Sequence, residues 1–393
     1  MCLGVYLYRV QKCRLVFKKL MRIAIYTDTI SEHQMPVAWD LVKEFGENSV
    51  RYFYVKEGAL HRKMMMGSDA VKRPWTLKIS ENLDMFNDWA ENAEILYTIF
   101  RLPSLMERRI QKRLITLYMS ERWLKPPVGM LRLLHPAYFM MARRMLKCFE
   151  SGLVTYLPTG IVAATDMLRI ASIVKGRFIK AMFQKRPMFE HCVGGAIDDA
   201  PWMRMWGYFV KPGTEPRQRR PIHRPLKILW VGRYLRLKRV DTLIKAVLHL
   251  DDVTLDLYGT GEAEYSLRKL ANGSNKIHFH SSIPLDEVRR QMLEHDVYVM
   301  PSNGFDGWGA VISEAIEEGM VVLGTSVVGA SATILPCQNV FEVGDWRKLA
   351  RILELVLRPE SAVDAPKFVS IDGWSARDAS KFMVEFIKNG TCA

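Results

Sequence analysis

Short apolar segments alternate with polar or amphipathic ones over residues 226–345. Six of these segments predict strands of a parallel sheet, most of them as continuous apolar runs that suit burial on both faces. They are 227–232, 253–259, 277–281, 297–300, 321–325 and 340–343. Between them, apolar residues recur at helical spacing, as in 240–250. Repeated strand–helix units of this length predict a doubly wound sheet.

The first half of the chain is less regular but has the same character. Its predicted strands are 21–27, 50–55, 95–98, 114–119 and 154–157. A helix is predicted at 37–45. The expected fold is therefore α/β, with two Rossmann-like doubly wound domains facing a cleft. A cleft between two such domains is the expected ligand site.

The segment 213–225 separates the two halves. It contains three prolines, four arginines and almost nothing apolar, as is typical of an interdomain linker. We therefore expect an N-terminal, acceptor-side domain at 21–212 and a C-terminal, nucleotide-binding domain at 226–370. A final helix is expected at 371–393, with a return to the first domain as one option. Residues 1–20 are expected to be a basic extension.

Positive charge is concentrated in the first half. Residues 1–220 hold 36 Lys and Arg against 20 Asp and Glu, whereas residues 221–393 hold 20 against 22. Residues 101–147 mix apolar side chains with two acidic and eleven basic residues: Arg101, Arg108, Arg109, Lys112, Arg113, Arg122, Lys125, Arg132, Arg143, Arg144 and Lys147. Such a mixture suits an anionic membrane surface, with a solvated basic face as the alternative. Nucleic acid is not favoured, because no recognised binding module accompanies the charge.

Two further patterns exclude other classes of protein. The chain has no run of about 20 uninterrupted apolar residues, so no transmembrane helix is predicted. Its six cysteines are scattered, with neither a Cys-x-x-Cys pair nor a His/Cys cluster. That pattern argues against a structural zinc and favours a reducing compartment.

Candidate chemistry follows the ends of two predicted strands. Gly232 and Arg233 come directly after the first strand of the second half, with Lys238 five residues beyond Arg233. Two cations at a strand end can neutralise a diphosphate. Gly259 and Gly261 follow the next strand and let the backbone approach a ligand, although they also suit a plain tight turn.

A more specific signal spans residues 301–319. A strand ends at proline, a glycine-rich loop carries Asp306, and a predicted helix carries Glu314 eight residues later. Loop glycines and a helix N-terminus together offer backbone N–H groups to an anion. Carboxylates accept hydrogen bonds from sugar hydroxyls. The alternative for Glu314 is a surface acid that compensates the helix dipole.

These residues resemble the retaining GT-B glycosyltransferases of the group 1, or family 4, class. The resemblance is carried by 231–234 with Lys238, by 258–261, by 296–302, and by Asp306 with Glu314. It implies an enzyme that transfers a sugar from a nucleotide-diphosphate donor with retention of anomeric configuration. A UDP-sugar is favoured over a GDP-sugar, and neither a cofactor nor a metal is implied.

The resemblance also assigns roles residue by residue. Arg233 and Lys238 are expected to bind the donor diphosphate, and Glu314 the ribose hydroxyls. The catalytic set on the donor side is completed by Asp306, which is expected to contact the donor sugar. The backbone of Gly307, Trp308 and Gly309 is expected nearby.

Two features depart from the family pattern. Asp306 stands where the family has Glu, so its carboxylate is one methylene shorter. No strong motif supplies the histidine that often lies near the reacting sugar in the first domain. His33, after the first strand, is one candidate for that side of the cleft, and Ser120-Glu121-Arg122 is the other.

The stretches 25–36 and 206–209 look like a bacterial cell-surface polysaccharide branch of the family. The expected acceptor is thus a lipid-linked or growing surface glycan at the cytoplasmic face of the inner membrane. One rival is a non-catalytic binding partner that retains the fold. The other is an NAD-dependent enzyme, which would need a Gly-x-Gly-x-x-Gly motif that is absent. The oligomeric state stays open.

Overall fold

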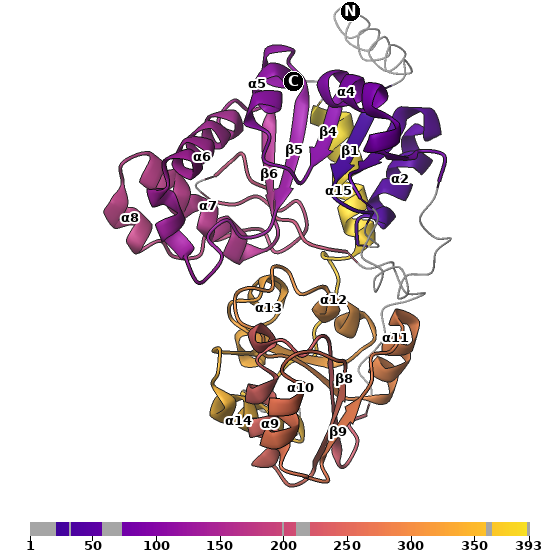
Figure 1. The fold of residues 1–393 in the computed structure, drawn as a ribbon, viewed down its shortest axis with the longest axis vertical. Coiled ribbons are helices and arrows are strands. Elements are labelled where there is room, and N and C mark those ends of the chain that lie inside the picture. Colours follow the sequence, from indigo (N-terminus) through magenta and orange to yellow (C-terminus); the bar gives the residue numbers. More distant parts are fainter. Residues whose placement is uncertain are drawn as a thin grey trace, which may run out of the picture.

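The computed structural model describes residues 21–30, 33–56, 73–198, 200–209, 221–358 and 364–390. These residues form two lobes, one above the other in Figure 1, and each lobe is built on its own six-stranded sheet. The expected extension at 1–20 lies outside the described residues, as does the part of the expected linker before Pro221.

All strands of the N-terminal lobe are parallel. They are β1 (Ile23–Thr27), β2 (Val50–Tyr54), β3 (Thr76–Lys78), β4 (Ile95–Thr98), β5 (Ile115–Ser120) and β6 (Val154–Pro158), in the spatial order β3-β2-β1-β4-β5-β6. The five strands predicted for this half are confirmed to within two residues at each end. The prediction missed β3, a three-residue edge strand whose side chains are only partly buried.

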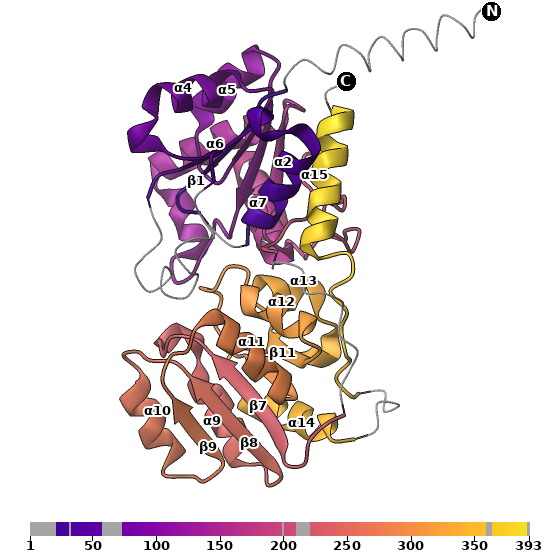
Figure 2. The same ribbon diagram turned by 90° about the vertical axis from the view of Figure 1, so that its right-hand side faces the viewer.

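Helices cover both faces of this sheet (Figures 1 and 2). They are α2 (Met35–Phe45), α4 (Leu83–Asn92), α5 (Pro103–Gln111), α6 (Pro136–Phe149), α7 (Ile161–Val174) and α8 (Phe178–Met182), with 3-10 turns η1 (Glu47–Ser49), η2 (Ile79–Glu81) and η3 (Gly129–Leu134). Proline occupies the first turn of α2, α5 and α6. Its fixed φ suits that position, and its missing N–H has no partner within the helix there.

The C-terminal lobe repeats the design. Its strands are β7 (Leu226–Val231), β8 (Val253–Tyr258), β9 (Ile277–His280), β10 (Val297–Met300), β11 (Val321–Thr325) and β12 (Val340–Phe341), all parallel, in the order β12-β11-β10-β7-β8-β9. Its helices are α9 (Val240–Leu248), α10 (Glu264–Ala271), α11 (Leu285–Glu294), α12 (Ala310–Glu317), α13 (Gly329–Ile334) and α14 (Trp346–Val356), with turns η4 (Arg236–Lys238) and η5 (Cys337–Asn339). The two doubly wound α/β domains expected from the sequence are confirmed.

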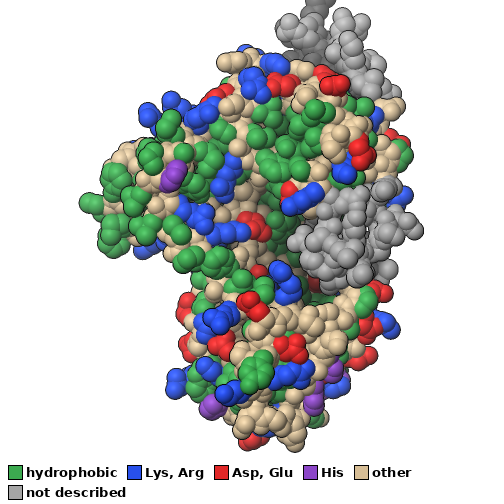
Figure 3. Space-filling view, in the orientation of Figure 1, with side chains coloured by type: hydrophobic (Ala, Val, Ile, Leu, Met, Phe, Trp, Pro, Cys, Tyr) green, Lys and Arg blue, Asp and Glu red, His purple; other side chains and the backbone are tan. Residues whose placement is uncertain are grey.

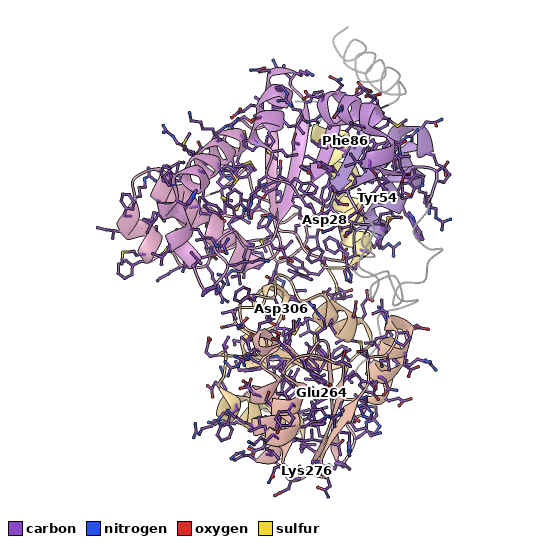
Figure 4. All side chains as sticks on the ribbon, viewed as in Figure 1. Asp28, Tyr54, Phe86, Glu264, Lys276 and Asp306 are labelled. Carbon is purple, nitrogen blue, oxygen red and sulfur yellow. The ribbon has the colours of Figure 1, made fainter. Side chains whose placement is uncertain are left out.

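The strand order of each sheet reverses at one point, between β1 and β4 in the first lobe and between β7 and β10 in the second. Doubly wound sheets bind ligands at the carboxyl ends of the strands beside such a point. Asp28 follows β1 and Asp306 follows β10. Figure 4 shows both on the sides of the lobes that face each other. The two candidate ligand edges therefore border one cleft.

The last helix, α15 (Ala376–Gly390), lies beside α2 of the N-terminal lobe, although it follows the C-terminal lobe in sequence (Figure 2). Ala379, Met383 and Ile387 recur every fourth residue and are almost completely buried. Near the C-terminal end of α2, Lys388 forms an ion pair with Glu44. The chain therefore passes between the lobes twice.

One residue of the expected basic surface lies in the core instead. Arg109 is completely buried, and its guanidinium donates hydrogen bonds to the carbonyls of Ala90, Ala93 and Ile115 and to the Thr116 hydroxyl. Burial lowers the pKa of Arg109 to about 10. The expectation that it contributes to a surface was wrong, because these acceptors bind four of its donors inside the lobe.

Candidate active site

The loop after β7 presents two cations at the strand end. Arg233 is exposed, and among the described residues its guanidinium has no hydrogen-bond or ion-pair partner. Lys238 closes the 3-10 turn η4 and is mostly buried. The backbone N–H of Asn303, after β10, donates to the carbonyl of Leu237 at 2.9 Å. This bond joins the loops on both sides of the strand-order reversal, so the predicted donor residues lie together.

Lys238 and Asp306 form an ion pair across these two loops. The Lys238 Nζ lies 2.7 Å from Oδ1 and 2.8 Å from Oδ2 of Asp306. Both side chains are about four-fifths buried, with exposed fractions of 19% and 18%. The sequence assigned the lysine to the diphosphate and the carboxylate to the sugar. The structure shows that the two side chains pair with each other.

The glycines after β8 are required by backbone packing. A Cβ on Gly259 would lie 1.8 Å from the carbonyl oxygen of Gly232. A Cβ on Gly261 would lie 2.6 Å from the carbonyl oxygen of Tyr234. The loops after β7 and β8 thus pack too closely for any side chain at these positions. A direct contact of Gly259, Gly261 or Gly232 with a nucleotide stays a prediction.

Glu314 lies one turn into α12 and is only 3% exposed. The alternative of a surface acid at a helix N-terminus is therefore wrong, because surface acids are solvated. Burial raises the pKa of Tyr298 on β10, and the nearby charges of Asp306 and Glu314 raise it further. Two carboxylates thus lie close to one buried strand end. Gly309, with φ of 84°, begins the helix in a conformation that favours glycine.

Trp308 connects the lobes. Its indole is almost completely buried, and a Cβ on Gly160 or Gly207 of the N-terminal lobe would meet the ring at 3.1 or 2.7 Å. Its ring also lies 5.9 Å from that of Trp374, measured between centroids. The side chain of this predicted donor residue therefore packs against the other lobe, and a contact of its backbone with the donor stays a prediction.

Glu121 of the N-terminal lobe reaches the glycine-rich loop. A Cβ on Gly307 would lie 2.2 Å from the Glu121 carboxyl carbon, so this carboxylate lies directly against the Gly307 backbone. Lys125 Nζ donates to it at 2.5 Å and the Tyr208 hydroxyl at 3.3 Å. Burial raises the pKa of Tyr208, and the Glu121 charge adds to this. An acidic group of the first lobe thus faces the loop where a donor sugar is expected.

Arg122 makes a second contact between the lobes. Its Nη1 donates to the carbonyl of Gly304 at 3.4 Å, and its Nε donates to Asp166 at 3.1 Å. Asp166 is buried in α7 and so holds the guanidinium in place. The structure therefore brings Glu121 and Arg122 of the predicted patch Ser120-Glu121-Arg122 against the glycine-rich loop after β10.

His33, the other candidate, lies on the same side of the N-terminal lobe. Its ring centroid is 6.0 Å from that of Tyr208. It also borders a small, mainly apolar cavity with Trp206 and Met383. His33 thus lies beside Tyr208, and the Tyr208 hydroxyl donates to Glu121. Glu121 in turn lies against Gly307 of the glycine-rich loop.

Comparison with known proteins identifies the lower lobe of Figure 1. Residues 214–367 match the family model described as "Glycosyl transferases group 1". The second half of this chain is therefore similar to the group 1 glycosyltransferases. All donor-side residues named above, from Gly232 to Glu314, lie inside the matched region.

Curated relatives match over about a third of this chain. The lipopolysaccharide core biosynthesis glycosyltransferase LpsE of Rhizobium meliloti is 31% identical over 139 residues, which cover 34% of this chain and 40% of that protein. The GtfA subunit of a UDP-N-acetylglucosamine–peptide N-acetylglucosaminyltransferase of Streptococcus pneumoniae is 28% identical over 116 residues, 28% of this chain and 23% of the relative. The chain thus matches less than half the length of either relative.

Solved structures match both lobes together. HepE of Anabaena in complex with UDP superposes with a TM-score of 0.61 and 13% identity, covering 94% of this chain and all of that one. The lipopolysaccharide glycosyltransferase WaaG superposes with a TM-score of 0.50 and 14% identity, covering 93% and 95%. At such identities the likeness shows the fold alone. The expected GT-B architecture, a second lobe facing the glycosyltransferase domain, is confirmed.

Sequence reasoning missed two residues that face the glycosyltransferase domain. Asp28 follows β1 at the point where the strand order reverses, and its charge is among those that raise the pKa of Tyr208. Tyr208 lies in the stretch 206–209, where no periodicity marks a role in the cleft. Asp28 carried a usable signal, since charged residues after predicted strands were the candidates in the second half.

Proposed function

We propose that this chain is a glycosyltransferase that moves a sugar from a nucleotide-diphosphate donor to a glycan acceptor. One observation carries the proposal. Two cations, Arg233 and Lys238, and two carboxylates, Asp306 and Glu314, converge at the point of strand-order reversal in the group 1 domain, beneath Glu121 of the other lobe. This set contains the groups that a sugar diphosphate needs.

The cations account for binding and for departure of the leaving group. A nucleoside diphosphate gains negative charge as its bond to the sugar breaks, and preorganised cations stabilise that charge. Arg233 is available without breaking an ion pair. Lys238 becomes available when the donor takes the place of Asp306, and sugar hydroxyls then satisfy that carboxylate. The ion pair thus holds both side chains near their working positions before the donor arrives.

The remaining roles follow from burial. Glu314 lies deep enough to accept hydrogen bonds from ribose hydroxyls without competition from water. The backbone of Gly307, Trp308 and Gly309 opens α12, whose N-terminus favours an anion. Retention, which rests on the family resemblance, means that the new glycosidic bond forms on the face from which the diphosphate leaves.

The donor is proposed to be a UDP-sugar. HepE, of the same fold, was solved with UDP and with UDP-glucose, and the name of GtfA contains UDP-N-acetylglucosamine. The acceptor is proposed to be a lipid-linked or surface glycan at the cytoplasmic face of the inner membrane. LpsE and WaaG, both named for lipopolysaccharide synthesis, support that choice. Among the described residues, no helix has the length and apolarity to cross a membrane.

A melting-temperature screen across UDP-, GDP-, ADP- and CMP-sugars and NAD tests the donor. A UDP-sugar at 100 times its dissociation constant is expected to stabilise the folded chain by about 2.7 kcal/mol, and the other compounds by much less. A shift with NAD alone would support the dehydrogenase rival. A shift with UDP-sugar, but neither hydrolysis nor transfer with any glycan, would support the non-catalytic rival.

A further inference from the structure

Exposed apolar side chains are concentrated on one part of the N-terminal lobe. Of fifteen large apolar residues that the structure describes as exposed, ten lie between Val128 and Met188. They are Val128, Met130, Leu131, Leu134, Met140, Phe178, Ile179, Met182, Phe183 and Met188, on or beside η3, α6 and α8. Figure 3 shows hydrophobic side chains gathered at the outer end of this lobe, with Lys and Arg beside them. We call these ten residues the apolar patch.

The helix α8 is the most exposed part of the patch. Phe178, Ile179, Met182 and Phe183 have exposed fractions of 61–77%, and Ala181 alone in the helix is buried. Fully burying one such large side chain gains about 1.5–3 kcal/mol. Three of them on one five-residue helix, with Phe183 directly after it, are therefore typical of a surface that meets an apolar phase.

Charge around α8 has a single sign. Residues 175–188 contain five Lys and Arg and no acidic residue. Lys175 pairs with Glu150, and Arg186 donates to the carbonyl of Ser326 in the other lobe. Arg177, Lys180 and Lys185 are exposed, and none of the three has an ion-pair partner among the described residues. Three uncompensated cations thus lie among four exposed apolar side chains.

The basic cluster at 101–113 differs from this segment. Arg109 is buried, and both Arg108 and Lys112 bind Glu91. Arg144, farther along, pairs with Glu107. These cations are already neutralised or covered by their own lobe. Uncompensated charge mixed with exposed apolar side chains is also present at α8, which the sequence pattern did not single out.

We propose that the apolar patch, with Arg177, Lys180 and Lys185, docks the enzyme on an anionic lipid bilayer. The proposal rests on the proposed function, to which it adds the membrane-facing surface and its orientation. Apolar side chains enter the headgroup boundary, and nearby cations attract anionic lipids. A second copy of the chain fits less well, because a symmetric contact would place these cations opposite one another.

The fold relates this surface to the cleft. The helix α7 begins at the contact between the lobes, where the N–H of Ile161 donates to the Thr333 hydroxyl at 2.9 Å. It ends at Val174, just before the basic segment. Its fourteen residues span roughly 21 Å at 1.5 Å per residue. The docking surface and the contact between the lobes therefore lie at opposite ends of α7, roughly 21 Å apart.

Vesicle sedimentation tests the docking surface. The full chain is expected to bind vesicles of equal phosphatidylglycerol and phosphatidylcholine, and to bind pure phosphatidylcholine vesicles much more weakly. Lys180→Gln with Lys185→Gln is expected to weaken binding to the anionic vesicles roughly 30-fold, from about 1 kcal/mol per cation. Phe178→Ser with Phe183→Ser is expected to weaken it at least as much. Leu83→Ser with Met85→Ser, two exposed apolar residues on α4, is the matched control and is expected to change nothing.

The outcomes separate this proposal from the proposed function. All variants are expected to keep the wild-type melting shift with UDP, because none alters the cleft. Absence of a melting shift with UDP in the wild type would contradict the donor assignment. Vesicle binding would still test the docking surface in that case. Equal binding to both vesicle types, or unchanged binding by the α8 variants, would overturn the docking surface. So would a wild-type dimer in light scattering that the Phe178→Ser, Phe183→Ser variant converts to a monomer with unchanged vesicle binding.

Discussion

The two lobes share a scaffold but differ in what their loops carry. Each has six parallel strands in the same kind of order, with one reversal. In the C-terminal lobe, the cations and carboxylates follow strand ends at spacings that the sequence reveals. In the N-terminal lobe, Glu121 and Arg122 reach the cleft from the end of β5, and Tyr208 from a segment far away in sequence. Loops on a rigid scaffold carry the chemistry of a site, so the same scaffold can present different groups at the two edges of the cleft.

The largest expected effect concerns the donor side of this comparison. Lys238→Ala and Glu314→Gln are each expected to lower the transfer rate by about 1,000-fold, comparable to removal of a preorganised charged or hydrogen-bonding group. Circular dichroism and the melting temperature should stay close to wild type. Arg236→Ala, an exposed cation in the same turn, is the control. Near-normal turnover in either variant would show that the donor site lies elsewhere.

The contact between the lobes gives the next prediction. Trp308→Ala is expected to lower the free energy of unfolding by about 3 kcal/mol, because the indole is buried against Gly160 and Gly207. Its loss should also separate the unfolding of the two lobes into two calorimetric transitions. Trp346→Ala, a half-buried tryptophan within the C-terminal lobe, should leave a single transition. A single unchanged transition in Trp308→Ala would mean that other contacts couple the lobes.

A smaller effect separates the acceptor side from the donor side. Glu121→Gln removes the charge that faces Gly307 but leaves every donor residue in place. It is expected to lower the transfer rate about 30-fold, within the range of a positioned acid or base, without changing the melting shift with UDP. Glu107→Gln, an exposed acid paired with Arg144, is the control. If Glu121→Gln also lost the melting shift with UDP, Glu121 would belong to the donor site instead.

The smallest expected effect concerns the pH dependence of the C-terminal lobe. Burial acts to raise the pKa of Asp256, but hydrogen bonds from His295 and His280 outweigh it and lower the pKa. A carboxyl group whose pKa is lower in the folded than in the unfolded chain stabilises the fold at pH values above the unfolded-state pKa. This stabilisation is lost as the pH falls through the folded-state pKa. We expect a loss of about 1 kcal/mol below pH 4, measured by urea unfolding. Asp256→Asn should lack this step; a similar step in the variant would assign it to another group.

The fold was predictable to a large extent for a physical reason. Parallel strands covered on both faces must be apolar throughout, and such runs can be recognised without knowledge of their neighbours. For that reason β7, β10 and β11 agree with their predictions at nearly every residue. The strand β3 was missed because an edge strand with partly buried side chains needs no apolar run. The helix α8 was missed because a short exposed helix has no buried face to create a period.

The sequence by itself determined the two sheets and the chemical identity of the donor residues, because strand ends and their following loops are local in the chain. Only the tertiary structure decided which groups meet. It joined Lys238 to Asp306, buried Glu314 and Arg109, and placed Trp308 in the other lobe. It also left α8 exposed beside uncompensated cations. Such pairings depend on distances between segments far apart in sequence, and residue spacing carries no information about those distances.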